Sequence, residues 1–335
     1  MLHFLFFICL GFFLTSCDSN NKPTVYHTSD TIQLTPVPLY IIGDSTVNNM
    51  TSIHNKRVEW GWGNVIDELM KQPNLKYNRA RSGTSSKTYY LDTPTWSSDH
   101  YWGNGTTPNQ YGKKGMAQLI LESNISQGAF LLIYFGGNDA INVKTPHYHK
   151  QTAPEKNIAK LKKVPNTLTS YEYNLRKYID FSLDHNITPV LITPTSRMKL
   201  YDHSDCPNYG KYVSMLSCSA QLIYKIPTAS TWNKNPFQGQ VLDYAQAMKD
   251  LQKEYSQKNK KVLLLDLTTA SMQHYQKVAD INGTSEKNKN KYIRKLFSYD
   301  DPTHFNYAGA KEMAKLIKTL ACSNSGDQKL CYQFK

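Results

Sequence analysis

The order of apolar segments in this sequence predicts an α/β fold, a three-layer α/β/α sandwich around a mostly parallel central sheet. Short continuous apolar runs alternate with longer segments in which apolar residues recur every three or four positions. Continuous apolar runs are typical of parallel strands buried on both faces, and their alternation with helices is typical of layered α/β folds. The chain has 335 residues, of which 40% are hydrophobic, which is enough for a full core.

Each predicted element follows from one of these two patterns. The apolar runs predict strands over residues 38–42, 129–135, 188–193 and 261–266. Apolar residues that gather on one helical face predict helices over residues 60–71, 168–184, 240–256 and 307–320. Three segments fit no simple connection and are predicted as long, functional or disordered loops: 84–115, 141–166 and 197–239.

The N-terminus has the pattern of an export signal. Residues 4–14 form an apolar run that is too short to span a membrane comfortably and lies where the core of a signal peptide lies. Leu14-Thr15-Ser16-Cys17 resembles a bacterial lipobox, whose cysteine becomes the lipid-modified first residue. An ordinary signal peptide is the alternative, and the run lacks the usual preceding Lys or Arg. We expect an exported protein, lipid-anchored at the bacterial cell envelope, that contacts the membrane through Cys17 alone.

These features divide the chain into successive regions. Residues 1–17 are the predicted lipoprotein signal, and residues 18–36, rich in Ser, Thr, Asn and Pro, are a polar tether. Residues 37–322 form the predicted domain, with an insertion at about 197–239, and residues 323–335 are a C-terminal tail.

The net charge of +13 belongs to the mature chain, because the signal contains no Lys, Arg, Asp or Glu. Such a charge favours an anionic partner, which includes nucleic acid, an acidic polysaccharide and a membrane surface. The lysines are scattered or lie in loops such as 287–291, and export argues against nucleic acid. No nucleic-acid partner is expected.

Four cysteines remain once the export signal is set aside, and they allow three disulfide pairings. Their short separations and an oxidising compartment favour the pairs Cys206–Cys218 and Cys322–Cys331. A metal site is the alternative, but the cysteines form no Cys-x-x-Cys pair and have no paired histidine spacing near them. We expect disulfides, and no metal or cofactor.

Two polar motifs at opposite ends of the chain indicate nucleophilic chemistry. Gly43-Asp44-Ser45-Thr46-Val47 follows the first predicted strand, and Asp301-Pro302-Thr303-His304 lies near the C-terminus. A serine hydroxyl becomes a good nucleophile when an imidazole takes its proton, and a carboxylate orients that imidazole. Separately, Ser45 fits a helix cap and His304 an ordinary surface residue. Together the motifs predict a serine esterase.

These residues resemble the SGNH, or GDSL-type, hydrolase superfamily, and within it the rhamnogalacturonan acetylesterase-like carbohydrate esterases. The match covers roughly residues 38–320, and it implies that the central sheet is flavodoxin-like. Its blocks, in order, are Gly43 to Val47, Gly61-Trp62-Gly63, the glycine block Asn78 to Thr88, Gly136-Gly137-Asn138-Asp139, Tyr173 to Ile179, Pro189 to Pro194, and Asp301 to Ala310.

The resemblance implies a catalytic triad. Ser45 is the implied nucleophile, His304 the base and Asp301 the carboxylate that orients the base. Asp300 is the alternative acid, although only Asp301 has the three-residue spacing to His304 that the family has.

The resemblance also implies an oxyanion hole. Its donors are the backbone N–H groups of Ser45 and Gly83 and the side-chain amide of Asn138, aimed at the oxygen that becomes negative during acyl transfer. Many relatives have histidine where this chain has Gly137, so one contact beside the oxyanion is absent here.

The expected activity is removal of acetyl groups from a polysaccharide, with pectic rhamnogalacturonan as the favoured backbone. An acetylated polysaccharide or oligosaccharide is then the partner. The alternatives are an esterase or lipase that acts on small or lipid esters, and a surface lipoprotein that binds glycans without catalysis. The long loops are polar and aromatic rather than apolar, which favours sugars over lipids.

Overall fold

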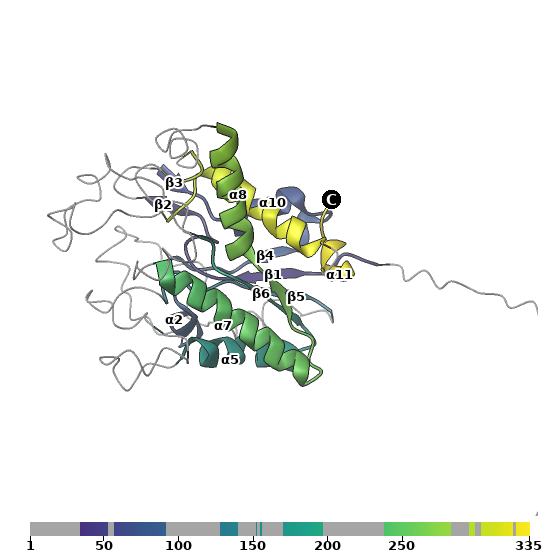
Figure 1. Ribbon diagram of the computed structural model, residues 1–335. Coiled ribbons are helices and arrows are strands. Elements are labelled where there is room, and N and C mark those ends of the chain that lie inside the picture. The colour runs from purple at the N-terminus through teal and green to yellow at the C-terminus, as the bar shows by residue number, and fades with distance from the viewer. Residues whose placement is uncertain are drawn as a thin grey trace, which may run out of the picture. The chain divides into compact units, whose positions relative to one another are not determined.

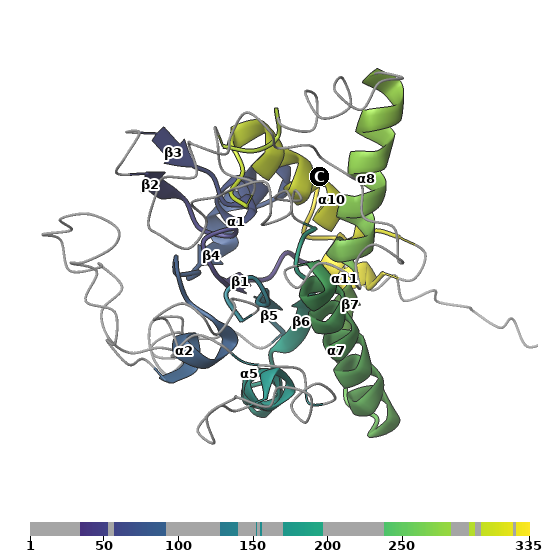
Figure 2. The same cartoon turned by 60° about the vertical axis from the view of Figure 1, so that its left-hand side comes forward.

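A five-stranded sheet forms the centre of the fold, in the order β4-β1-β5-β6-β7 (Figures 1 and 2). Its strands are β1 Leu39–Ile42, β4 Lys76–Asn78, β5 Phe130–Ile133, β6 Thr188–Ile192 and β7 Leu263–Leu265. Every neighbouring pair is parallel. All residues of β1 and β5 are buried, as the centre of a sheet covered on both faces requires.

The structure is a computed structural model. It describes residues 34–52, 57–91, 128–139, 152, 155, 170–196, 238–282, 295–298, 303–323 and 326–335. Thr35–Lys335 form one unit.

Helices cover both faces of the sheet (Figures 1 and 2). One face carries α1 Trp62–Val65, α8 Leu267–Asn282 and α10 Tyr307–Ala321, and the other carries α2 Ser86–Leu91, α5 Tyr171–Asp184 and α7 Gln238–Gln257. Alternate residues of β1 point to opposite faces, so Ile41 packs in one apolar cluster with Met313 of α10, and Tyr40 packs in the other with Leu175 of α5. The predicted three-layer α/β/α sandwich is confirmed.

The four predicted strands are confirmed, and so are the three predicted helices that correspond to α5, α7 and α10. The α5 helix begins at Tyr171 rather than 168, because the Ser170 side chain caps it by accepting a hydrogen bond from the Tyr173 N–H. The helix predicted over 60–71 is shorter than expected. Only α1 is α-helical there, and a 3₁₀ helix, Ile66–Leu69, follows it.

Several elements were missed because their sequences lack a clear apolar period. The edge strand β4 reads Lys-Tyr-Asn, and α8 has polar side chains such as Ser271 on its buried face. The predicted loop 84–115 is wrong where α2 begins at Ser86. A hairpin of β2 Met50–Ser52 and β3 Arg57–Glu59 was also missed. This hairpin matters for the site because its strand β3 ends beside the candidate site.

The predicted C-terminal tail belongs to the folded domain. The short helix α11, Gln328–Cys331, is followed by Phe334, which is buried. Backbone pairing fixes this end, since the Lys71 N–H donates to the Gln333 carbonyl and the Lys335 N–H to the Leu69 carbonyl. Residues 323–335 are therefore not a separate tail.

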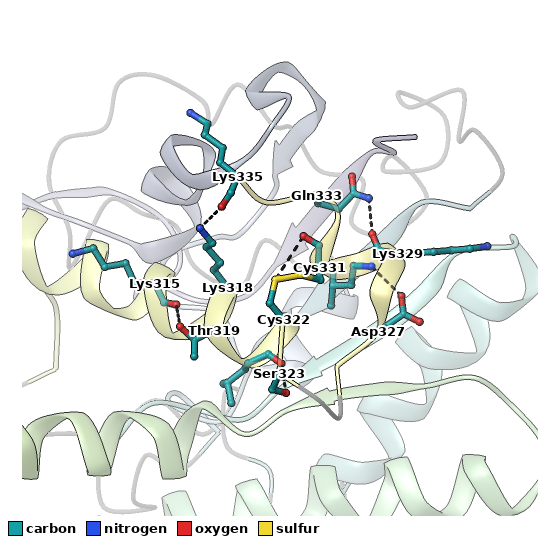
Figure 3. The surroundings of a disulfide bond; sticks show 12 residues. Lys315, Lys318, Thr319, Cys322, Ser323, Asp327, Lys329, Cys331, Gln333 and Lys335 are labelled. Carbon is teal, nitrogen blue, oxygen red and sulfur yellow. Dashed lines mark hydrogen bonds between the residues drawn. A yellow bond between two sulfur atoms is a disulfide. The ribbon is translucent and has the colours of Figure 1, made fainter. Parts of the chain in front are cut away.

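The predicted disulfide between Cys322 and Cys331 is present, and it joins the end of α10 to α11 (Figure 3). The other predicted pair, Cys206 and Cys218, lies outside the described residues, as does the predicted export signal with Cys17. Among the helices of the described ranges, none has the length and apolar character to cross a membrane.

We predict that removing this disulfide, by Cys322→Ala together with Cys331→Ala, lowers the free energy of unfolding by about 2 to 3 kcal/mol, because the closed loop restricts the unfolded chain. Urea denaturation measures the change. Lys329→Ala alters an exposed side chain inside the same loop and keeps the disulfide, so it is expected to stay within about 0.5 kcal/mol of wild type. A double variant as stable as Lys329→Ala would contradict the prediction.

Candidate active site

Ser45 and His304 meet although they lie 259 positions apart. The Ser45 Oγ is 2.7 Å from the His304 Nε2, within hydrogen-bonding distance. Ser45 follows the carboxyl end of β1, and His304 precedes α10, whose N-terminus is capped by Asn306. Ser45 is only 8% exposed. The contact places a hydroxyl against a proton acceptor at the edge of the sheet where α/β proteins bind ligands.

The Asp44 side chain holds the serine turn. Its Oδ1 accepts hydrogen bonds from the Thr46 N–H at 2.9 Å and from the Thr46 hydroxyl at 2.7 Å. The Asp44 carbonyl accepts from the backbone N–H groups of Val47 and Asn48. Asp44 is buried, so the two hydrogen bonds from Thr46 also offset the cost of removing its carboxylate from water.

The Gly-Trp-Gly block packs directly against this turn. The Trp62 N–H donates to the Thr46 carbonyl, and the Gly63 N–H donates to the Val47 carbonyl, both at 3.1 Å. A Cβ atom at Gly61 would lie 2.1 Å from the Val47 carbonyl carbon, a distance that the backbone cannot accept. Glycine at this position therefore allows the two backbone segments to approach closely, and this contact fixes the turn that carries Ser45.

Hydrogen bonds bring the glycine and asparagine blocks to the same edge. The Arg81 N–H donates to the Gly43 carbonyl at 2.9 Å, and the Asn138 side-chain amide donates to the Thr84 carbonyl at 2.8 Å. Gly83, between these contacts, has a φ of 77°, which favours glycine. Since β1 and β5 are adjacent parallel strands, Ser45 and Asn138 lie at one edge of the sheet.

Asp139 anchors the asparagine block from within the core. Its carboxylate accepts hydrogen bonds from the Ser86 N–H and hydroxyl, the Gly136 N–H and the Thr152 hydroxyl. Burial raises the pKa of Asp139 from its ordinary value of 3.8 to about 6, although hydrogen bonds from Ser86 and Thr152 oppose the rise. The same contacts fix the start of α2.

A carboxylate that the sequence analysis did not single out faces His304. The Glu59 Oε2 lies 3.4 Å from the His304 Nδ1, the ring nitrogen opposite to the one that contacts Ser45. Glu59 is buried, at 6% exposure. Its position two residues before the Gly-Trp-Gly block was the available signal. The predicted triad acid, Asp301, and its alternative, Asp300, lie outside the described residues.

A serine hydroxyl held against an imidazole at the carboxyl edge of a parallel sheet has the geometry that nucleophilic catalysis by serine requires. The family model of GDSL-like lipases and acylhydrolases matches residues 39–317. The chain belongs to this family and is a carboxylic ester hydrolase of the SGNH type.

Two Bacillus subtilis proteins are similar over most of the chain. "Probable rhamnogalacturonan acetylesterase YesY" is 25% identical over 83% of this chain and 89% of its own length. "Rhamnogalacturonan acetylesterase RhgT" is 23% identical over 84% of this chain and 88% of its own length. A crystal structure of a third Bacillus subtilis protein aligns with a TM-score of 0.46 and 16% identity. That alignment covers 86% of this chain but 56% of the other.

We predict that the Asp139 carboxyl titrates with a midpoint near pH 6. Because folding raises this pKa, the stability that Asp139 contributes is fully present below pH 3.8 and is lost as the pH rises through about 6. Carbon-13 NMR of protein labelled at its aspartate carboxyl groups measures the midpoint, and Asp139→Asn identifies the resonance. A midpoint at or below the ordinary value would contradict the prediction.

Proposed function

We propose that this protein removes acetyl groups from a polysaccharide, favours acetylated rhamnogalacturonan, and acts through a Ser-His-Asp mechanism with an acyl-enzyme intermediate. The contact of 2.7 Å between the Ser45 hydroxyl and His304 carries the proposal. The proposed location is the bacterial cell envelope, with the chain exported and anchored by lipid on Cys17.

In the first half-reaction, the Ser45 Oγ forms a bond to the acetyl carbonyl carbon while the His304 Nε2 takes the hydroxyl proton. The bond between the carbonyl carbon and the sugar oxygen then breaks, and His304 returns that proton to the sugar. Water next attacks the acetyl-serine with His304 again as base, which releases acetate and restores Ser45. In this proposal Asp301 orients the imidazole.

The names of the two curated relatives support the choice of substrate. Both are named as rhamnogalacturonan acetylesterases, and both align with more than four-fifths of this chain. The net charge of +13 also suits an acidic polysaccharide such as pectin, since a positive surface attracts anionic chains.

Acetate release from acetylated rhamnogalacturonan, xylan and mannan tests the proposal, with Ser45→Ala beside wild type. We expect the fastest release from rhamnogalacturonan and a loss of at least about 1000-fold in Ser45→Ala, because the variant lacks the attacking oxygen. Circular dichroism confirms that the variant folds. Hydrolysis of long-chain acyl esters with no acetate from any glycan would favour the lipase alternative, and unchanged turnover in Ser45→Ala would refute the mechanism.

The oxyanion hole in this proposal consists of the Ser45 and Gly83 backbone N–H groups and the Asn138 side-chain amide. One amide hydrogen of Asn138 is directed to the Thr84 carbonyl, and an amide carries two. The contact with Thr84 thus orients the group while the second hydrogen serves as the donor to the oxyanion. A neutral amide performs this role without altering the charge of His304.

We predict that Asn138→Ala lowers kcat about 100- to 1000-fold with little change in KM, because the lost hydrogen bond forms mainly in the transition state. Steady-state kinetics on 4-nitrophenyl acetate measure both constants, and thermal unfolding shows whether the lost contact with Thr84 affects the fold. If kcat stays within about threefold of wild type, the third donor lies elsewhere.

A further inference from the structure

We infer that Glu59 is a positioning residue for His304. The Glu59 carboxylate orients the imidazole and stabilises the ring when the ring carries the proton from Ser45. This inference rests on the proposed function, in which His304 is the base. It assigns a role to a residue outside the Ser-His-Asp set.

Glu59 and Ser45 contact the two different nitrogens of one ring. The Ser45 Oγ is 2.7 Å from Nε2, and the Glu59 Oε2 is 3.4 Å from Nδ1. Hydroxyl, imidazole and carboxylate therefore follow one another in the order that a serine nucleophile requires. A separation of 3.4 Å is long for a hydrogen bond, but contacts of this kind tighten when substrate binds.

Backbone pairing fixes the carboxylate beside the ring. Glu59 ends β3, and the next residue, Trp60, forms an antiparallel bridge with Phe305, the residue after His304. The Trp60 N–H donates to the Phe305 carbonyl at 2.9 Å, and Phe305 is fully buried. Glu59 and His304 each lie next in sequence to one of two paired residues. Backbone pairing, rather than flexible surface side chains, therefore brings them close together.

The charge of Glu59 matters most while the ring is protonated. A negative group beside an imidazolium favours the charged form, and burial weakens the screening of this interaction by water. Among the described residues, the groups with a resolved contact to the ring are Ser45, from the turn after β1, and Glu59, from β3. Asp301 precedes His304 on its own segment and is the other candidate carboxylate, so the role of Glu59 is tested both with Asp301 and without it.

The experiment compares Glu59→Gln, Asp301→Asn and the double variant with wild type on 4-nitrophenyl acetate. Glu59→Gln keeps the size of the side chain and removes its charge. We expect kcat to fall about 10- to 100-fold with KM within about threefold, because the interaction acts on proton transfer rather than on binding. We also expect the acid limb of kcat/KM to move about one pH unit lower, since the protonated ring loses a stabilising charge.

A matched control is Glu68→Gln, the same substitution at an exposed glutamate that contacts Tyr307 and Lys311 on α10. It is expected to keep kcat within about twofold of wild type and the acid limb in place. A purely structural role for Glu59 would lower the melting temperature without moving the limb.

The inference is overturned if Glu59→Gln keeps kcat within about threefold and an unmoved acid limb in both backgrounds. Should Glu59→Gln not fold, Glu59→Asp decides. Its carboxylate keeps the charge but lies farther from the ring, so it is expected to lower kcat and to move the acid limb part of the way towards lower pH. A variant with both kcat and the acid limb at their wild-type values overturns the inference equally. An inactive Ser45→Ala beside a fully active Glu59→Gln refutes the role of Glu59 alone, whereas an active Ser45→Ala refutes the proposed function itself.

Discussion

The position of His304 depends on one site of backbone pairing. Phe305 forms antiparallel bridges with both Trp60, which is distant in the sequence, and Phe297, which is nearby, so both segments meet at this buried residue. His304 is its neighbour, and from there the ring reaches Ser45 at the end of β1. Because the pairing uses main-chain groups, the contact between two reactive side chains far apart in sequence is secured by atoms that take no part in the chemistry.

Three buried carboxylates belong to the segments that form the site, and their partners differ. Asp44 accepts hydrogen bonds from Thr46, and Asp139 accepts hydrogen bonds from the Ser86 N–H and hydroxyl, the Gly136 N–H and the Thr152 hydroxyl. Such bonds offset the cost of burial and make each carboxylate a link between backbone segments. Glu59 is different because it contacts His304, a group whose charge changes during proton transfer. A buried carboxylate whose hydrogen-bond donors keep the same charge is suited to a structural role. A buried carboxylate beside an imidazole that gains and loses a proton is suited to a role in the reaction.

The sequence was most informative where one local property decides the structure. Continuous apolar runs identified β1, β5, β6 and β7, and two polar motifs identified Ser45 and His304. The edge strand β4 and the helix α8 were missed because polar residues interrupt their apolar pattern. Glu59 was missed for another reason. No sequence motif relates a single glutamate in a short hairpin to a histidine near the other end of the chain. The pairing of Trp60 with Phe305 brings the two residues together.

The residues proposed for ester hydrolysis and the loops expected to select the ester belong to different parts of the chain. The edge that holds Ser45 and Asn138 is also where β5 and β6 end, and the predicted long loops 141–166 and 197–239 begin after these ends. Loops that start beside a reactive group can alter what reaches it while the paired backbone beneath stays the same. For this reason we expect the sugar preference to follow exchange of these two loops, rather than changes to the residues that hold Ser45 and His304 together.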